Sequence, residues 1–330
     1  MLHPGGPRIL APNLARTRVI VNTWYRIMRK VIDLECDLPP DEAGNPRKLE
    51  SATHPPGYGD PERLPPLPGH GFSNYERIFT RRTDGGAAAE PAKKHGMSIE
   101  AFVALMDRAG VEVGVLRAGN QIIGDILAHY PKRFIGLATI SPHDGMRGVR
   151  ELVRLVRERG FQAMRVSSLY NMVPASDRRY YPLYAKCVEL DIPVRIYTNM
   201  NYATDRPYDL GHPRHLDQVA MDFPELRIVA ALSGWPWVNE MVALLRRHPN
   251  LYADTASHHP RYFGVPGSGW EQFMQFGNTL LQDKIMVGLS WEAFGLSMEA
   301  LIEEYARLPL KEPVLDKWLY KNAQRFFRLG

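Results

Sequence analysis

The sequence predicts an α/β fold, a single distorted (β/α)8 TIM barrel with a long insertion after its first strand. Eight short apolar runs alternate with segments that have the periodicity of amphipathic helices. The runs do not strictly alternate polar and apolar residues, which is typical of a parallel sheet covered on its outer face. No G-x-G-x-x-G or Walker sequence follows any run, so eight strand–helix units favour a barrel over a nucleotide-binding sheet.

The first predicted strand is Val31–Leu34, and two irregular segments flank it. Residues 1–28 show no clear periodicity, and we expect them to form an N-terminal arm. The segment 38–97 is rich in Pro and Gly, with Pro55-Pro56 and Gly85-Gly86 among its turn residues. A loop this long is usually a lid, a binding loop or disordered, so we expect a lid-like insertion within one barrel domain, 29–330.

From Ser98 the alternation becomes regular, and Ser98 is a good N-cap for a helix over Ile99–Ala109. The next strands are predicted, in chain order, at Val111–Leu116, Phe134–Ile140, Ala163–Ser167, Val194–Thr198, Arg227–Leu232, Leu251–Thr255 and Ile285–Leu289. The helices between them are predicted at Gly148–Arg159, Tyr180–Leu190, His215–Phe223, Trp237–Arg247 and Trp270–Leu281. Two final helices, Met298–Leu308 and Val314–Leu329, are expected to pack outside the barrel.

Composition excludes several classes of protein. Apolar residues make up 45% of the 330 residues and charged residues 23%, which is ordinary for a globular chain. The net charge of +5 is mild, and its basic residues are spread along the chain without interleaved aromatic residues, so we expect no nucleic-acid partner. No apolar stretch approaches the ~20 residues that a membrane-spanning helix needs.

Cysteine usage and the N-terminal sequence bear on location. Two cysteines, Cys36 and Cys187, cannot build a disulfide framework or, alone, a cysteine-based zinc site. The apolar run after Arg18 is broken by Asn22 and Arg26, unlike a secretory signal. We therefore expect a cytoplasmic protein.

In a barrel of this kind, catalytic groups lie at the carboxyl ends of the strands and in the loops that follow. The polar residues at these positions include Glu35, Asp37, Arg117, His143, Arg165, Ser167, Tyr197, Asp254, His258, His259 and Ser290.

Seven segments in order resemble the amidohydrolase superfamily, in the branch that contains aminocarboxymuconate semialdehyde decarboxylase and γ-resorcylate decarboxylase. The segments begin at Phe134 (FIGLATISP), Gly160 (GFQAMR), Tyr180 (YYPLYAKCVELDIPV), Phe223 (FPELRIV, then GWPWVNE), His248 (HPNLYADT), Asp283 (DKIMVG) and Asn322 (NAQRFF). The resemblance covers the chain from about Lys30 and implies the same barrel. Members of this branch are commonly dimers, so it also implies a homodimer.

The resemblance further implies a divalent metal, commonly zinc or manganese, but the residues depart from the family's ligands. The family binds the metal through H-x-H or E-x-H after strand one, His after strand five and Asp after strand eight, and a further His after strand six usually assists catalysis. Here these positions hold Glu35 and Asp37, Tyr197, Ser290 and Leu232. Zinc prefers imidazole or thiolate ligands, so we expect the family's metal to be lost, although another divalent metal on Glu35 and Asp37 stays open.

The acids of the first strand are the strongest catalytic candidates. Period two places Asp33, Glu35 and Asp37 on one face. Clustered carboxylates raise the pKa of at least one member, which suits acid–base catalysis. We predict catalytic roles for Glu35 and Asp37 and a structural role for Asp33. The alternative is that neighbouring Arg or Lys side chains neutralise them.

Two further residues are predicted to be catalytic. Arg165 lies inside the predicted barrel, where a charge needs an anionic partner; that partner is either Glu35 or Asp37, or a carboxylate of the substrate. Tyr197 replaces a ligand. Its phenol either donates to an oxyanion or acts as a general acid, or else it fills the space that the metal and its histidine leave.

A second group is predicted to contact substrate. The aromatic side chains among them suit a flat cyclic molecule, and a serine nucleophile is not expected because no nucleophile-elbow sequence surrounds Ser290. The residues are Ser290, Trp291, His258, His259, Trp235 and Ser167.

These residues predict a metal-independent lyase or isomerase (a decarboxylase, hydratase or dehydratase) that acts on a small, anionic, cyclic or aromatic carboxylated compound. Without a metal to generate hydroxide, proton transfer on an activated substrate is easier than amide hydrolysis. Two alternatives stay open: a non-catalytic relative that binds a ligand or partner, and a decarboxylase or hydrolase with a rearranged metal site.

Overall fold

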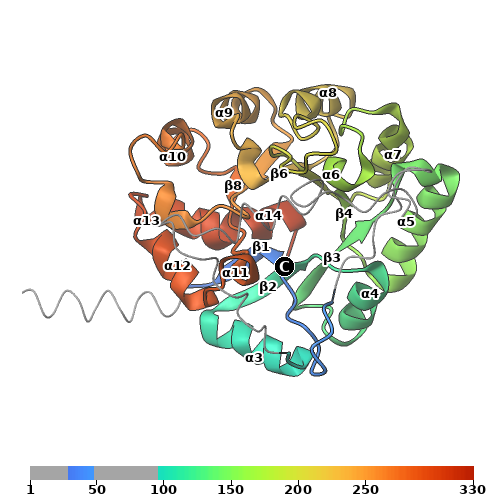
Figure 1. The fold of residues 1–330 in the computed structure, drawn as a ribbon, viewed down its shortest axis with the longest axis horizontal. Coiled ribbons are helices and arrows are strands. Elements are labelled where there is room, and N and C mark those ends of the chain that lie inside the picture. The colour runs from blue at the N-terminus through green and yellow to red at the C-terminus, as the bar shows by residue number, and fades with distance from the viewer. Residues whose placement is uncertain (1–28, 48–95) are drawn as a thin grey trace, which may run out of the picture.

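Eight parallel strands, in the order β1 to β8, form a nearly closed barrel surrounded by helices, as predicted (Figure 1). The computed structural model describes residues 29–47 and 96–330. The predicted arm, 1–28, and residues 48–95 of the predicted insertion lie outside the described residues.

The strands are β1 Val31–Cys36, β2 Val111–Leu116, β3 Phe134–Thr139, β4 Ala163–Val166, β5 Val194–Tyr197, β6 Ile228–Ala231, β7 Leu251–Asp254 and β8 Ile285–Met286. The α-helices are α3 Ile99–Ala109, α4 Asn120–His129, α5 Met146–Arg159, α6 Ser168–Asn171, α7 Tyr181–Glu189, α8 Arg214–Asp222, α9 Val238–Arg247, α10 Glu271–Gly277, α11 Trp291–Phe294, α12 Met298–Ala306, α13 Glu312–Asp316 and α14 Asn322–Phe327. A π-helical turn, Lys317–Lys321, joins α13 to α14, and short 3-10 turns cover Pro142–Asp144, Arg178–Tyr180, Leu232–Gly234 and Pro260–Tyr262.

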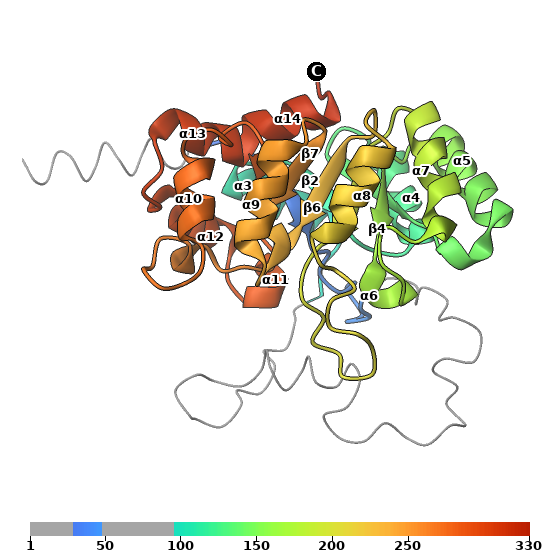
Figure 2. The ribbon, with the colours of Figure 1, turned by 90° about the horizontal axis from the view of Figure 1, so that it is seen from above.

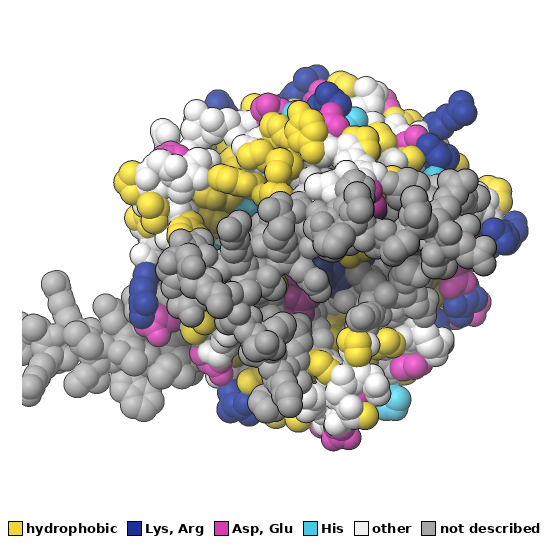
Figure 3. All heavy atoms as spheres, in the orientation of Figure 1, with side chains coloured by type: hydrophobic (Ala, Val, Ile, Leu, Met, Phe, Trp, Pro, Cys, Tyr) yellow, Lys and Arg dark blue, Asp and Glu magenta, His cyan; other side chains and the backbone are white. Residues whose placement is uncertain are grey.

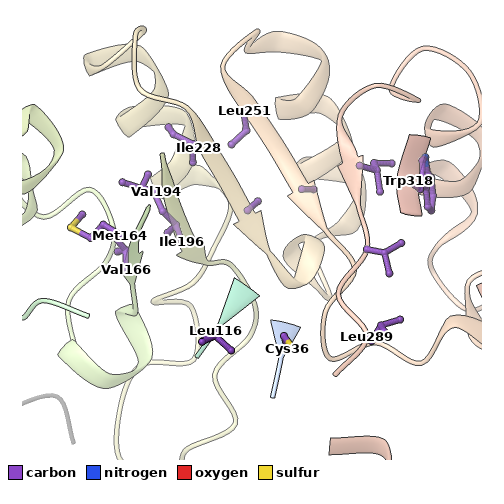
Figure 4. Packing of buried hydrophobic residues seen from close by; sticks show 14 of the residues in the cluster. Cys36, Leu116, Met164, Val166, Val194, Ile196, Ile228, Leu251, Leu289 and Trp318 are labelled. Atoms are coloured by element: carbon purple, nitrogen blue, oxygen red, sulfur yellow. The ribbon is translucent and has the colours of Figure 1, made fainter. Parts of the chain in front are cut away.

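Successive side chains along the strands point to opposite faces of the sheet and so belong to two apolar clusters. The outer cluster lies between strands and helices; Figure 4 shows Val194, Ile196, Ile228 and Leu251 among its members. The inner cluster fills the barrel with Ile32, Leu34, Val115, Ile135, Leu137, Ala163, Val229 and Met286, and Ala323 and Phe326 of α14 join it. Both faces of each strand are therefore buried, which explains why the runs read as continuously apolar.

Helix α14 closes one end of the barrel, and polar groups occupy the other. Figure 2 shows α14 across one end of the strands, whereas α6 and α11 lie at the opposite end. The carboxyl ends of all eight parallel strands point to that opposite end, which we call the mouth.

A bulge in β1 makes the predicted alternation of its acids wrong. The register slips between Asp33 and Cys36, so that Asp33 pairs with Gly114 and Cys36 with Leu116. The side chain of Asp33 instead bridges β1 to the segment after β8. Its Oδ1 atom accepts hydrogen bonds from the backbone N–H groups of Leu289 (2.7 Å) and Glu35 (3.0 Å). With the bond from the Leu34 N–H to the Val287 carbonyl, this joins the two edges of the sheet.

Helix α4 was absent from the predicted elements, and β8 is shorter than expected. Gly119 at the N-cap of α4 supplies no side-chain cap, and Gly124 lies within the helix, so the usual sequence signals of a helix are weak. Strand β8 ends at Met286, three residues before the predicted end. Within residues 29–47 and 96–330, no helix is long and apolar enough to span a membrane.

We predict that Phe326→Ala lowers the free energy of unfolding by about 3–5 kcal/mol, because the ring is 3% exposed and its removal leaves a cavity at the closed end. Chemical denaturation measures the change. Leu280→Ala, at a site that is 69% exposed, is the control and should change it by no more than about 0.5 kcal/mol. Equal effects of the two substitutions would contradict a role for α14 in filling the barrel.

Candidate active site

Charged side chains from five strands or their following loops meet at the mouth. Glu35 lies one residue before the end of β1 and Asp37 just beyond it, Arg117 follows β2, and Arg165, Arg195 and Asp254 lie on β4, β5 and β7. In Figure 3, which looks onto this face, acidic and basic side chains are visible side by side near its middle. All of these residues except Arg117 are less than 10% exposed, so their charges require partners.

Five of them form a continuous chain of ion pairs with alternating sign, which we call the charge chain. Arg117 contacts Asp37 at 2.7 Å and Glu35 at 2.9 Å. Arg195 contacts the other oxygen of Glu35 at 2.6 Å and Asp254 at 2.7 Å. The second carboxylate oxygen of Asp254 accepts from the backbone N–H groups of Leu232 and Ala256. The charge chain thus crosses the mouth from β2 to β7 and fixes Arg195 between two acids.

These contacts set the protonation of the acids. Burial acts to raise the pKa of Glu35, but Arg117 and Arg195 outweigh it and hold the pKa below its ordinary value. Burial raises the pKa of Asp254 despite its bond to Arg195. The pKa values of both arginines are raised, because the facing carboxylates overcome the effect of burial. Glu35 is therefore a carboxylate clamped by two cations.

Arg165 has no such partner. Its residue is 8% exposed, and it makes no ion pair or hydrogen bond with any residue that the structure describes. Its guanidinium lies 5.4 Å from the ring centroid of Tyr170, a cation–π contact. Burial and the neighbouring charge of Arg117 lower the pKa of Arg165 to about 10. The sequence indicated two kinds of partner for Arg165: an acid of the first strand or a substrate carboxylate. The acids Glu35 and Asp37 make their ion pairs with Arg117 and Arg195 instead.

The positions that correspond to the family's metal ligands and its strand-six histidine do not form a metal site. Both oxygens of Glu35 face guanidinium groups. The Tyr197 hydroxyl donates to the Met200 carbonyl at 3.0 Å, Leu232 offers no donor atom, and Ser290 Oγ accepts from the Ser257 N–H at 2.8 Å. No group of three or more His, Cys, Asp or Glu side chains in the described ranges could hold a metal ion. A donor set so engaged does not fit the divalent metal that the resemblance implies.

The predicted substrate-contacting residues are divided between the mouth and its surroundings. The indole N–H of Trp291 donates to the Asp37 carbonyl at 3.0 Å, and its ring stacks on Phe102. Ser167 caps α6 by accepting from the Tyr170 N–H. These two side chains therefore position the segments that carry Asp37 and Arg165, and their predicted contact with substrate stays a prediction.

Trp235 and the two histidines lie among aromatic neighbours. Trp235 stacks on Trp270, and His258 packs against both rings while its Nε2–H donates to the Leu232 carbonyl at 3.1 Å. Burial lowers the pKa of His258 to about 4, so this imidazole is neutral near pH 7. His259 contacts Glu304 of α12 at 2.7 Å and Phe294 of α11. The structure thus brings together Glu35, Asp37 and Arg165 and leaves His259 in a separate cluster.

Arg195 is the residue that sequence reasoning missed, and Asp254 was named only as a polar residue at a strand end. The available signal was a charged residue inside the buried strand Val194-Arg-Ile-Tyr. An arginine in such a position needs a carboxylate across the barrel, and Asp254 and Glu35 supply two.

Comparison with known proteins agrees with the fold and the branch. A family model described as amidohydrolase matches residues 55–329. Over 142 residues the chain is 29% identical to 2-keto-4-carboxy-3-hexenedioate hydratase of Sphingobium sp.; the match covers 38% of this chain and 42% of that protein. The chain thus matches less than half the length of this curated relative.

Similar solved structures include an uncharacterised TIM-barrel protein from Bordetella bronchiseptica, at 24% identity over 91% of this chain and 98% of that one, with a TM-score of 0.67. The 5-carboxyvanillate decarboxylase of Sphingomonas paucimobilis matches at 17% identity over 91% and 99%, with a TM-score of 0.61. The 4-oxalomesaconate hydratase of Rhodopseudomonas palustris matches at 20% over 90% and 95%, with a TM-score of 0.55. Because the sequence identities are all below 25%, these matches show only that this chain and the solved structures share the barrel fold.

We predict that Asp33→Asn stabilises the protein increasingly between pH 4 and pH 7. Burial raises the pKa of Asp33 from 3.8 to about 7, and its Oδ2 atom has no hydrogen-bond partner in the described part of the chain. The folded protein binds the proton of Asp33 more tightly than the unfolded chain does. The free energy of unfolding therefore falls as the pH rises from about 4 to about 7, by at most about 1.4 kcal/mol per pH unit. The Asn side chain keeps the oxygen that accepts from Leu289 and Glu35, and it does not ionise, so the variant does not lose stability in this pH range.

Urea unfolding of both proteins from pH 4 to pH 8 measures the difference in unfolding free energy. The difference should level off above about pH 7. Asp125→Asn, at a side chain that is 61% exposed, is the control. A difference that does not change with pH would show that Asp33 is ionised throughout.

Proposed function

Because this chain belongs to the amidohydrolase family, we propose that it is a lyase that acts without a metal ion on a small carboxylated compound, cyclic or aromatic. The observation that carries the proposal is the guanidinium of Arg165 at the mouth of the barrel, which is buried and has no ion pair or hydrogen bond to any described residue. A buried cation without an acid of its own is costly unless a ligand supplies the anion.

A carboxylate is the anion that fits best. Guanidinium binds carboxylate through two parallel hydrogen bonds, and this recognition is strongest where water is excluded. In the charge chain, Glu35, Asp37 and Asp254 contact Arg117 and Arg195. Among the described residues no carboxylate contacts Arg165 directly, so its hydrogen-bond donors are left for a substrate. Tyr170, which lies against Arg165, adds an aromatic surface beside that group.

Lyase chemistry is favoured by the residues that replace the family's ligands. A metal lowers the pKa of bound water and so makes hydroxide for hydrolysis. The guanidinium groups around Glu35 provide positive charge without binding water as a ligand. Decarboxylation and the addition or removal of water need a cationic environment and a proton carrier, and the named relatives include a hydratase and a decarboxylase.

Asp37 and Glu35 have different roles in this proposal. Glu35 is clamped by Arg117 and Arg195, so it holds both cations in place and stays ionised. Asp37 lies farther out, with an 11% exposed side chain that contacts Arg117 at 2.7 Å, and it carries the proton to or from the substrate. Tyr197, whose hydroxyl donates to Met200, supports the loop after β5.

We predict that Arg165→Met weakens the binding of benzoate about 30-fold or more, because a buried guanidinium–carboxylate pair contributes at least ~2 kcal/mol. Isothermal titration calorimetry measures the affinity, with benzyl alcohol as the uncharged probe. Arg147→Met, at a side chain that is 80% exposed, is the matched control and should bind as the parent does. Unchanged benzoate affinity in Arg165→Met would refute the carboxylate site.

We predict that protein treated with a chelator and shown by elemental analysis to lack metal keeps its full activity. A panel of cyclic and aromatic carboxylates, followed by CO2 release and by addition of water, identifies that activity. Asp37→Asn should lower kcat by about 100-fold or more, since it removes the proton carrier. Activity restored only by a divalent metal would support a rearranged metal site, and full activity of Asp37→Asn would refute its catalytic role.

A further inference from the structure

Three side chains form one transverse row above the apolar interior of the barrel. Thr139 of β3 pairs in register with Arg165 of β4, which pairs with Arg195 of β5. One step below, Leu137 pairs with Ala163, and both belong to the inner cluster. Paired residues two positions along a strand share a face, so the row points into the barrel at the floor of the mouth.

Two members of this row carry buried polar atoms that no described residue satisfies. Thr139 Oγ1 and Arg195 Nη2 are buried and have no hydrogen-bond partner among the described residues. Arg165 makes no ion pair or hydrogen bond within that same part of the chain. Buried polar groups are almost always hydrogen-bonded. Two such exceptions on either side of a guanidinium without an ion pair to any described residue indicate a place built for the oxygen atoms of a ligand.

Arg195 differs from Arg165 in being held rigidly. Its Nε donates to Asp254 at 2.7 Å and its Nη1 contacts Glu35 at 2.6 Å, whereas Nη2 makes no hydrogen bond to either acid. Arg165 is steadied by one aromatic contact with Tyr170. A donor whose position is fixed before the reaction stabilises charge that develops during it, because no reorganisation is needed at that moment.

We propose that Arg195 is a catalytic residue that donates through Nη2 to a substrate oxygen on which negative charge develops, while Arg165 holds the substrate carboxylate. This inference rests on the proposed lyase function. It assigns different roles to two neighbouring arginines: Arg165 binds the ground state, and Arg195 stabilises the reacting state.

The step balances for both reactions of the proposed function. In decarboxylation, the electrons of the breaking C–CO2 bond move onto a conjugated carbonyl oxygen, CO2 leaves, and a proton then adds to the carbon. In hydration, the oxygen of water bonds to the far carbon of a C=C bond that is conjugated with the carbonyl, and the water gives up a proton. The electrons of the broken C=C π bond move onto the carbonyl oxygen. The neighbouring carbon is then protonated. Both place an oxyanion opposite Nη2.

The test uses 3-nitropropionate, whose nitronate form carries a carboxylate and a second anionic oxygen group, and butyrate, which carries only the carboxylate. Calorimetry and the ultraviolet difference spectrum of the nitronate measure binding. We expect the parent protein to prefer the nitronate about 100-fold over butyrate, since one oxyanion donor is typically worth that factor. In Arg195→Lys this preference should fall at least ~30-fold, while butyrate affinity changes less than about threefold.

Lys keeps a positive charge between Glu35 and Asp254, so Arg195→Lys should fold. Should circular dichroism show that it does not, the double variant Arg195→Gln, Asp254→Asn removes a cation and its partner acid together and should lose the preference equally. Arg227→Lys, whose guanidinium bonds backbone carbonyls at the closed end, is the matched control and should keep both affinities.

The outcomes separate the two proposals. A nitronate preference that survives in Arg195→Lys or the double variant, or that is missing from the parent protein, overturns the role of Arg195 and leaves the carboxylate site standing. Failure of the parent protein to bind either probe refutes the carboxylate site, and with it the proposed function. Loss of the preference alone supports the role of Arg195.

Discussion

The clamping of Glu35 between two guanidinium groups governs the arrangement of the mouth. Its two oxygens contact Arg117 and Arg195, and through them the ends of β1, the loop after β2, β5 and β7 are tied into one electrostatic unit. Charges as buried as these are stable only when each has a partner. Because these acids are engaged in this way, Arg165 has no direct hydrogen bond or ion pair within residues 29–47 and 96–330, and the proposed chemistry of the site follows from its free donors.

Most of the barrel could be predicted because each strand is buried on both faces and is followed by a helix with a clear apolar stripe. Two local features escaped prediction for physical reasons. Gly119 and Gly124 weaken the signals of α4, which tertiary packing against β3 and α5 stabilises instead. The bulge in β1 depends on how the sheet closes between β1 and β8, and no pattern within Val31–Cys36 reveals it.

The candidate site was predicted in part. Glu35, Asp37 and Arg165 stand at strand ends, where the barrel rule finds them, and the departure from the family's ligands is visible in the sequence itself. The partners of these residues were not predictable, since an ion pair across the barrel depends on which strands face each other. Arg195 was overlooked because it precedes the end of β5, and its register with Arg165 appears only in the assembled sheet.

The charge chain also constrains how such a site can change over generations. Replacing Arg117 or Arg195 leaves Asp37 or Asp254 buried without its cation, a cost of about 3–5 kcal/mol in a protein whose whole stability is of the order of 5–15 kcal/mol. Arg195 and Asp254 are therefore expected to change together, and descendants of this sequence to inherit them as a pair.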